Sequence, residues 1–92
     1  MAVLSPAEIQ EGLQNTPGWR LENGTLAREF SFSDFREAMS FVNSVAAVAE
    51  SAGHHPDIDI RYSKVSLALS SHDAGGITEK DFSLADQIGK VL

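Results

Sequence analysis

Cysteine is absent from the 92 residues of the chain. Its absence excludes disulfide scaffolds, thiolate metal sites and cysteine nucleophiles, and it fits a reducing cytoplasm. Long apolar runs are absent too, since none approaches the roughly 20 residues that span a bilayer. The N-terminus, MAVLSPAEIQ, has neither the basic region nor the apolar stretch of a secretory signal. We therefore expect a cytoplasmic protein with no membrane partner.

Basic residues are scarce. The chain has 7 Lys and Arg against 13 Asp and Glu, which gives a net charge of −6 at pH 7. A chain of this sign lacks the positive surface that attracts phosphate backbones. Nucleic acid is therefore not expected as a direct partner.

The length indicates one domain that covers residues 1–92. An apolar content of 42% is enough for a core. A chain of this size buries only about 60–65% of its unfolded surface. Because the core is thin, we expect association into a homo-oligomer.

Turn and capping signals divide the chain into seven elements. Ser5 to Glu8 forms a capping box, and Asn23-Gly24 is a strong hairpin turn. Apolar residues recur at intervals of three and four in the helices and at every second position in the strands. The expected helices cover about residues 6–15, 34–52 and 79–92, and the expected strands cover 19–22, 25–32, 57–62 and 65–70.

The order of these elements, α-β-β-α-β-β-α, predicts an α+β two-layer sandwich. Its two hairpins would form a four-stranded antiparallel sheet with the helices on one face. Five aromatic residues occupy core periods and are interpreted as packing: Trp19, Phe30, Phe32, Phe35 and Phe41.

The second hairpin predicts that two histidines meet. If residues 63–64 form the turn, Tyr62 faces Val65 and every apolar residue of the hairpin has an apolar partner. Continued outward, this register places His55 opposite His72 on the polar face, where paired Cβ atoms lie about 4.5–5.5 Å apart. Pro56 interrupts the ladder there, because it has no N–H to donate.

His54 lies beside this pair, so all three histidines of the chain are expected in one corner. Histidine titrates near pH 6.5, so that one ring can accept a proton while a neighbour donates one. A metal site is the competing use of the same residues. It is disfavoured because the adjacent residues His54 and His55 point to opposite sides of a strand, and no HxH or HxxxH spacing is present.

Two carboxylates need separate interpretations. Glu50 precedes His54 by four residues and is expected to point into the same corner, although a solvated side chain is the simpler alternative. Asp81 occupies the third position of a capping box that starts at Thr78, so its role is interpreted as structural.

The chain resembles the pterin-4a-carbinolamine dehydratase family. The resemblance covers about residues 18–92 and rests on Glu50-x-x-x-His54-His55-Pro56, Tyr62-Ser63-Lys64-Val65 and Leu69-Ser70-Ser71-His72-Asp73. Further similarity lies in Asp34-Phe35, Gly75-Gly76 and Thr78-Glu79-Lys80-Asp81. The chain departs at Gly53 from some members, which have an acidic or amide residue there, and at Ile58 from many members, which have an aromatic residue.

Membership of this family implies an enzyme that removes water from a 4a-hydroxytetrahydropterin to give a quinonoid dihydropterin, in the recycling of tetrahydrobiopterin. It implies no bound cofactor and no metal. It also implies a pterin substrate and a homotetramer paired by sheet edges and helix packing. Some animal members act as dimerisation cofactors of a homeodomain transcription factor, so a protein-binding coactivator module stays the alternative.

The resemblance also implies the site residues. The catalytic residues would be His54, His55 and His72. The substrate-binding residues would be Glu50, Ser70, Ser71 and Asp73.

Overall fold

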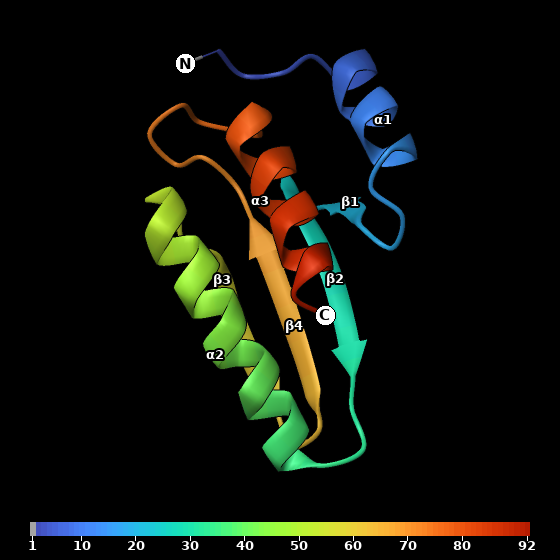
Figure 1. Ribbon diagram of the computed structural model, residues 1–92. Helices are drawn as coiled ribbons and strands as arrows, with labels where there is room; N and C mark the ends of the chain where they lie inside the picture. The colour runs from blue at the N-terminus through green and yellow to red at the C-terminus, as the bar shows by residue number, and fades with distance from the viewer. Residues whose placement is uncertain (1) are drawn as a thin grey trace.

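The computed structural model describes residues 2–92 and has the predicted order of elements (Figure 1). The helices and strands are α1 (Pro6–Gln14), β1 (Arg20–Glu22), β2 (Thr25–Ser31), α2 (Phe35–Ala52), β3 (Asp57–Arg61), β4 (Lys64–Leu69) and α3 (Glu79–Lys90). The expected α+β class is confirmed. Within residues 2–92, no helix is both long and apolar enough to span a membrane.

The strands form one open antiparallel sheet in the order β1-β2-β4-β3. The two hairpins therefore join through β2 and β4, which leaves β1 and β3 as the edges. Helices α2 and α3 lie over one face of the sheet, while α1 lies beside the start of α3 (Figure 1). Both expected features, the two layers and the helices on one side, are present.

Capping boxes fix the starts of two helices. The Ser5 hydroxyl accepts a hydrogen bond from the Glu8 backbone N–H, and the Glu8 carboxylate accepts one from the Ser5 N–H at 2.8 Å. These bonds favour the ionised carboxylate and lower the pKa of Glu8. Thr78 and Asp81 form the second box at the start of α3. Both boxes follow from a hydroxyl residue placed three positions before an acid.

The core lies between the sheet and helices α2 and α3. It contains the alternate residues of β2 and β4 that point towards the helices, such as Leu26, Val65 and Leu67. Phe41 of α2 packs on Phe30 at a centroid distance of 4.7 Å. One aromatic prediction was wrong: Phe35 is 50% exposed, because it begins α2 beyond the end of the sheet.

The predicted register of the second hairpin was wrong by two residues. Val65 pairs with Ile60 instead of Tyr62, and the turn is formed by residues 62–63. Tyr62 adopts a left-handed conformation with φ 55°, which a two-residue hairpin turn requires. A slip of two keeps every side chain on its face, and apolar matching favours the predicted register, which has one more apolar pair than the observed one.

The corrected register changes the site. Pairing between β3 and β4 ends at Asp57 and Ala68, before either histidine is reached. His55 and His72 are therefore not cross-strand partners. They belong instead to the two connections that leave this end of the sheet.

Packing of α1 on α3 gives a stability prediction. A Cβ atom at Gly12 would lie 2.6 Å from the ring of Phe82, whereas nothing lies within 4 Å of a Cβ at Gly89 in α3. We expect Gly12→Ala to lower the free energy of unfolding by about 1–2 kcal/mol through overpacking. Gly89→Ala should raise it by about 0.5–1 kcal/mol, since alanine favours a helix. Urea denaturation of both variants tests this, and equal effects would contradict the packing.

Candidate active site

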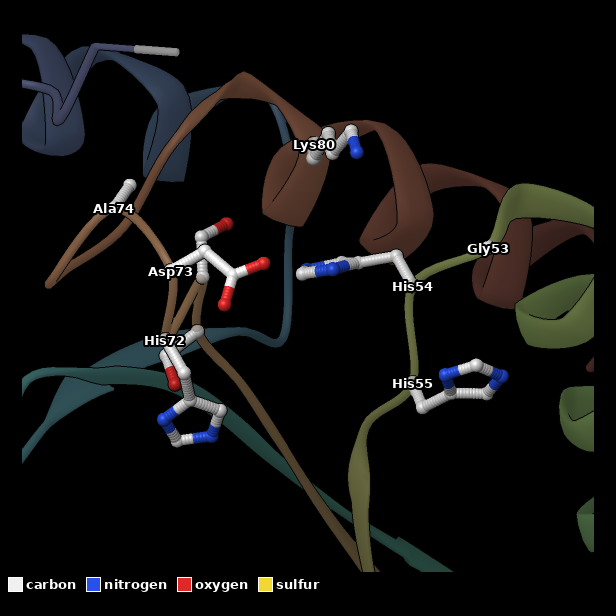
Figure 2. Close-up of a pocket in the computed structure, with 9 residues that line it drawn as sticks. Gly53, His54, His55, His72, Asp73, Ala74 and Lys80 are labelled. Carbon is white, nitrogen blue, oxygen red and sulfur yellow. The ribbon is translucent and has the colours of Figure 1, made fainter.

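The end of α2 directs two adjacent histidines in opposite directions. Gly53 terminates the helix in a left-handed conformation with φ 66°, and its N–H donates to the Glu50 carbonyl. The next N–H, of His54, donates to the Ala49 carbonyl at 3.2 Å. His54 then points across a hollow towards the loop after β4, while His55 points back towards α2 (Figure 2).

His54 is held by a buried carboxylate. Its Nε2 lies 2.5 Å from Oδ1 of Asp81, which is fully buried. The other oxygen of Asp81 accepts hydrogen bonds from the Thr78 backbone N–H at 2.9 Å and from the Ser71 hydroxyl at 3.0 Å. A buried carboxylate is stable only when such donors replace water. Among residues 2–92, no buried side-chain nitrogen or oxygen lacks a hydrogen-bond partner.

This arrangement determines the tautomer of the imidazole. An ionised carboxylate only accepts hydrogen bonds, so Nε2 of His54 must carry a proton. The lone pair of neutral His54 is then on Nδ1. Nδ1 can accept a proton, and the carboxylate beside Nε2 stabilises the imidazolium that results.

Asp81 is a residue of the site whose contact with His54 the sequence interpretation missed. Its capping role is real, but the cap uses only Oδ2 and leaves Oδ1 for His54. The signal in the sequence was that a carboxylate has two oxygens and a capping box occupies only one. Pairing with His54, 27 residues away, could not be deduced from local spacing.

Ser71 lines the hollow, but its hydroxyl points to the Asp81 carboxylate. It is only 7% exposed, and its hydroxyl also lies 2.8 Å from that of Thr78. Its backbone closes the loop that follows: Ser71 N–H donates to Gly76, and its carbonyl accepts hydrogen bonds from the N–H groups of Ala74 and Gly75 at 3.0 Å. This loop carries His72 and Asp73.

The two connections line an open cavity of about 390 Å³. It is lined by six of the predicted site residues, His54, His55, Ser70, Ser71, His72 and Asp73, together with Gly53, Ala74 and Lys80. Lys80 comes from the first turn of α3 and was not predicted (Figure 2).

Glu50 is the one predicted site residue outside this lining. Its carboxylate lies 3.1 Å from Nε2 of His55, and both side chains are exposed, at 81% and 63%. A solvent-exposed pair of this kind contributes little to stability. Within the part of the chain that the structure describes, no three His, Asp or Glu side chains gather as metal ligands.

Comparison with known proteins identifies the family of the chain. The family model described as "Pterin 4 alpha carbinolamine dehydratase" matches residues 2–91. The chain belongs to this family. Proteins of Chloroflexus aurantiacus and Acidobacterium capsulatum, assigned by name as pterin-4-alpha-carbinolamine dehydratases, are 55% and 56% identical over 92 residues. The alignments cover 100% of this chain and 99% and 100% of those proteins.

Solved structures of the pterin dehydratase type share the fold. A Brucella melitensis protein described as a transcriptional coactivator/pterin dehydratase is 31% identical, with a TM-score of 0.92 and 97% of each chain covered. A pterin dehydratase-like RuBisCO assembly factor of the alpha-carboxysome has a TM-score of 0.69. It is 23% identical, with 82% of this chain and 89% of that chain covered, and this likeness concerns the fold alone.

Adjacent serines give a matched test of the network around Asp81. Ser71→Ala removes a donor from a buried carboxylate, and we expect the free energy of unfolding to fall by about 1–3 kcal/mol. Ser70 directly follows β4, is half-buried and lines the cavity. Ser70→Ala should change the stability by about 0.5 kcal/mol or less. Thermal and urea denaturation measure both, and equal losses would contradict the network.

Proposed function

We propose that the chain catalyses the dehydration of a 4a-hydroxytetrahydropterin to a quinonoid dihydropterin. The observation that carries this proposal is the buried Asp81–His54 pair, which opens onto a cavity bounded on its other side by His72 and Asp73. We further propose that the chain acts in the cytoplasm as one domain, in tetrahydrobiopterin recycling. Family membership supports this role.

The reaction moves two protons and no electrons. The C–O bond at position 4a breaks, and the hydroxyl group takes up a proton and departs as water. The adjacent ring N–H loses a proton, and a carbon–nitrogen double bond forms in its place. A positioned acid or base contributes typically 10²–10⁴-fold to such a step.

The proposed roles follow from the surroundings of each histidine. His54 acts as the base, because the Asp81 carboxylate stabilises its imidazolium. His72 stands across the cavity and acts as the acid towards the departing hydroxyl. His55, at the rim beside Glu50, orients the pterin or relays a proton to solvent. Ser70 and Asp73 bind the pterin ring, and Ser71 acts through Asp81.

His72 gives the cleanest test of histidine catalysis. Its side chain is exposed and accepts no hydrogen bond in residues 2–92. His72→Ala should therefore leave the free energy of unfolding within about 0.5 kcal/mol of wild type, while kcat/KM falls roughly ten-fold or more. Stopped-flow kinetics of carbinolamine decay measures the rate, with Ser83→Ala at an exposed position of α3 as control. An unchanged rate would remove His72 from the mechanism.

His54→Ala is less suitable as a test of catalysis, because it changes the stability of the protein as well as its activity. It removes the partner of a fully buried carboxylate, which typically lowers stability by about 3–5 kcal/mol. His54→Gln keeps a donor near Asp81 and is the better choice. We expect it to lose about ten-fold or more in kcat/KM, and His55→Ala to lose as much. Circular dichroism checks that each variant is folded.

We also propose that the chain forms a homotetramer. Three apolar side chains of the second hairpin are exposed: Ile58 at 38%, Ile60 at 36% and Tyr62 at 70%. They lie on or beside β3, an edge strand with free backbone groups. A second copy that pairs along this edge would cover these side chains and the free backbone groups and form a dimer, and two such dimers would make the tetramer.

Sedimentation velocity at micromolar concentration tests this association. The wild type should sediment as an oligomer, and Ile60→Asp should shift it towards the 9.9 kDa monomer. Leu92→Asp is the control, since Leu92 is 61% exposed at the far end of α3. A wild type that is monomeric throughout would contradict the proposal.

The same apolar edge supports the second candidate function, a protein-binding coactivator module. The Brucella melitensis relative carries both descriptions, coactivator and pterin dehydratase. A complex with a helical protein partner that survives replacement of all three histidines, together with no acceleration of carbinolamine decay, would favour this alternative.

A further inference from the structure

The N-terminal segment before α1 contacts the loop that carries His72 and Asp73. The backbone N–H of Leu4 donates to the Ile77 carbonyl at 2.8 Å. The neighbouring Val3 lies over Gly76, where its Cγ1 would be 2.9 Å from an added Cβ. The segment runs across the top of the loop on its way to α1 (Figure 1). Neither contact is explained by the catalytic roles proposed above.

These contacts fall at a point of the loop that both sides of the cavity share. Gly76 closes the loop by pairing with Ser71, and so fixes the path of His72 and Asp73. Ile77 is 2% exposed and immediately precedes Thr78, whose N–H donates to Asp81. A displacement of residues 76–77 therefore moves both the His72 side of the cavity and the carboxylate that holds His54.

We propose that the Val3–Leu4 segment positions the active site, by holding residues 76–77 through one hydrogen bond and one close packing contact. This inference rests on the proposed dehydration for its kinetic test. Val3 and Leu4 do not line the cavity, so they act through the loop and are positioning residues. Displacements on the order of 1 Å of a catalytic group lower rates by up to about 10²-fold, so a small shift of the loop is measurable.

The hydrogen bond is tested with two substitutions at one position. Leu4→Ala keeps the backbone N–H, whereas Leu4→Pro removes it, and both shorten the same side chain. We expect Leu4→Pro to reduce kcat roughly ten-fold more than Leu4→Ala does, with folding checked by circular dichroism at the assay temperature. Equal rates in the two variants would overturn the role of the hydrogen bond.

The packing of Val3 on Gly76 is tested by one substitution that creates a steric clash and a second that removes it. Gly76→Ala places a methyl group against Val3 and should lower kcat several-fold, and the double variant Gly76→Ala with Val3→Ala should restore it. Gly12→Ala is the matched control, since it creates a similar clash 2.6 Å from Phe82, away from the loop. It should reduce stability without reducing kcat. If Gly76→Ala keeps the wild-type kcat, or the double variant fails to recover it, the proposal is wrong.

A second readout does not depend on activity. The ring resonances of His72, followed by proton–carbon NMR, should shift in Leu4→Pro and Gly76→Ala and stay unchanged in Leu4→Ala and Gly12→Ala. A wild type that does not accelerate carbinolamine decay would refute the proposed function alone. Unchanged His72 resonances in all four variants would refute the positioning role whatever the activity.

Discussion

The buried carboxylate of Asp81 is the constraint on which the site depends. A charge without access to water requires donors from several directions, and here they come from three separate parts of the chain. Thr78 supplies its own backbone N–H from the start of α3, Ser71 supplies a hydroxyl from the end of β4, and His54 supplies a ring N–H after α2. Satisfying one carboxylate therefore brings together the ends of three elements, and the cavity is the space left between them.

The same constraint links folding to chemistry. The donors that make Asp81 tolerable in the core also fix the ring of His54 in one tautomer, with Nδ1 as its acceptor. His72 and Asp73 are exposed residues of the loop that follows β4. Their loop is closed by Ser71, which is itself bound to Asp81, so that both sides of the cavity depend on the same buried group.

Much of the fold could be predicted from local patterns in the sequence. The order of elements followed from periodicity and caps, because Ser5, Thr78 and Gly53 signal helix ends through short-range hydrogen bonds. The hairpin register could not be predicted from apolar matching, because pairing Val65 with Tyr62 gives three apolar pairs and the observed pairing with Ile60 gives two. Only the left-handed turn at Tyr62 decides between them. The His55–His72 pairing was lost with that register, although both residues still line the cavity.

Replacement of Asp81 by Asn tests the account most directly. Asparagine has nearly the shape of aspartate, but its amide nitrogen placed towards His54 would donate to Nε2 and reverse the tautomer of the ring. We predict that the wild type accelerates carbinolamine decay and that folded Asp81→Asn, at equal concentration, loses at least about 10²-fold in kcat. A folded Asp81→Asn protein with the wild-type rate would contradict the dependence of catalysis on the buried carboxylate.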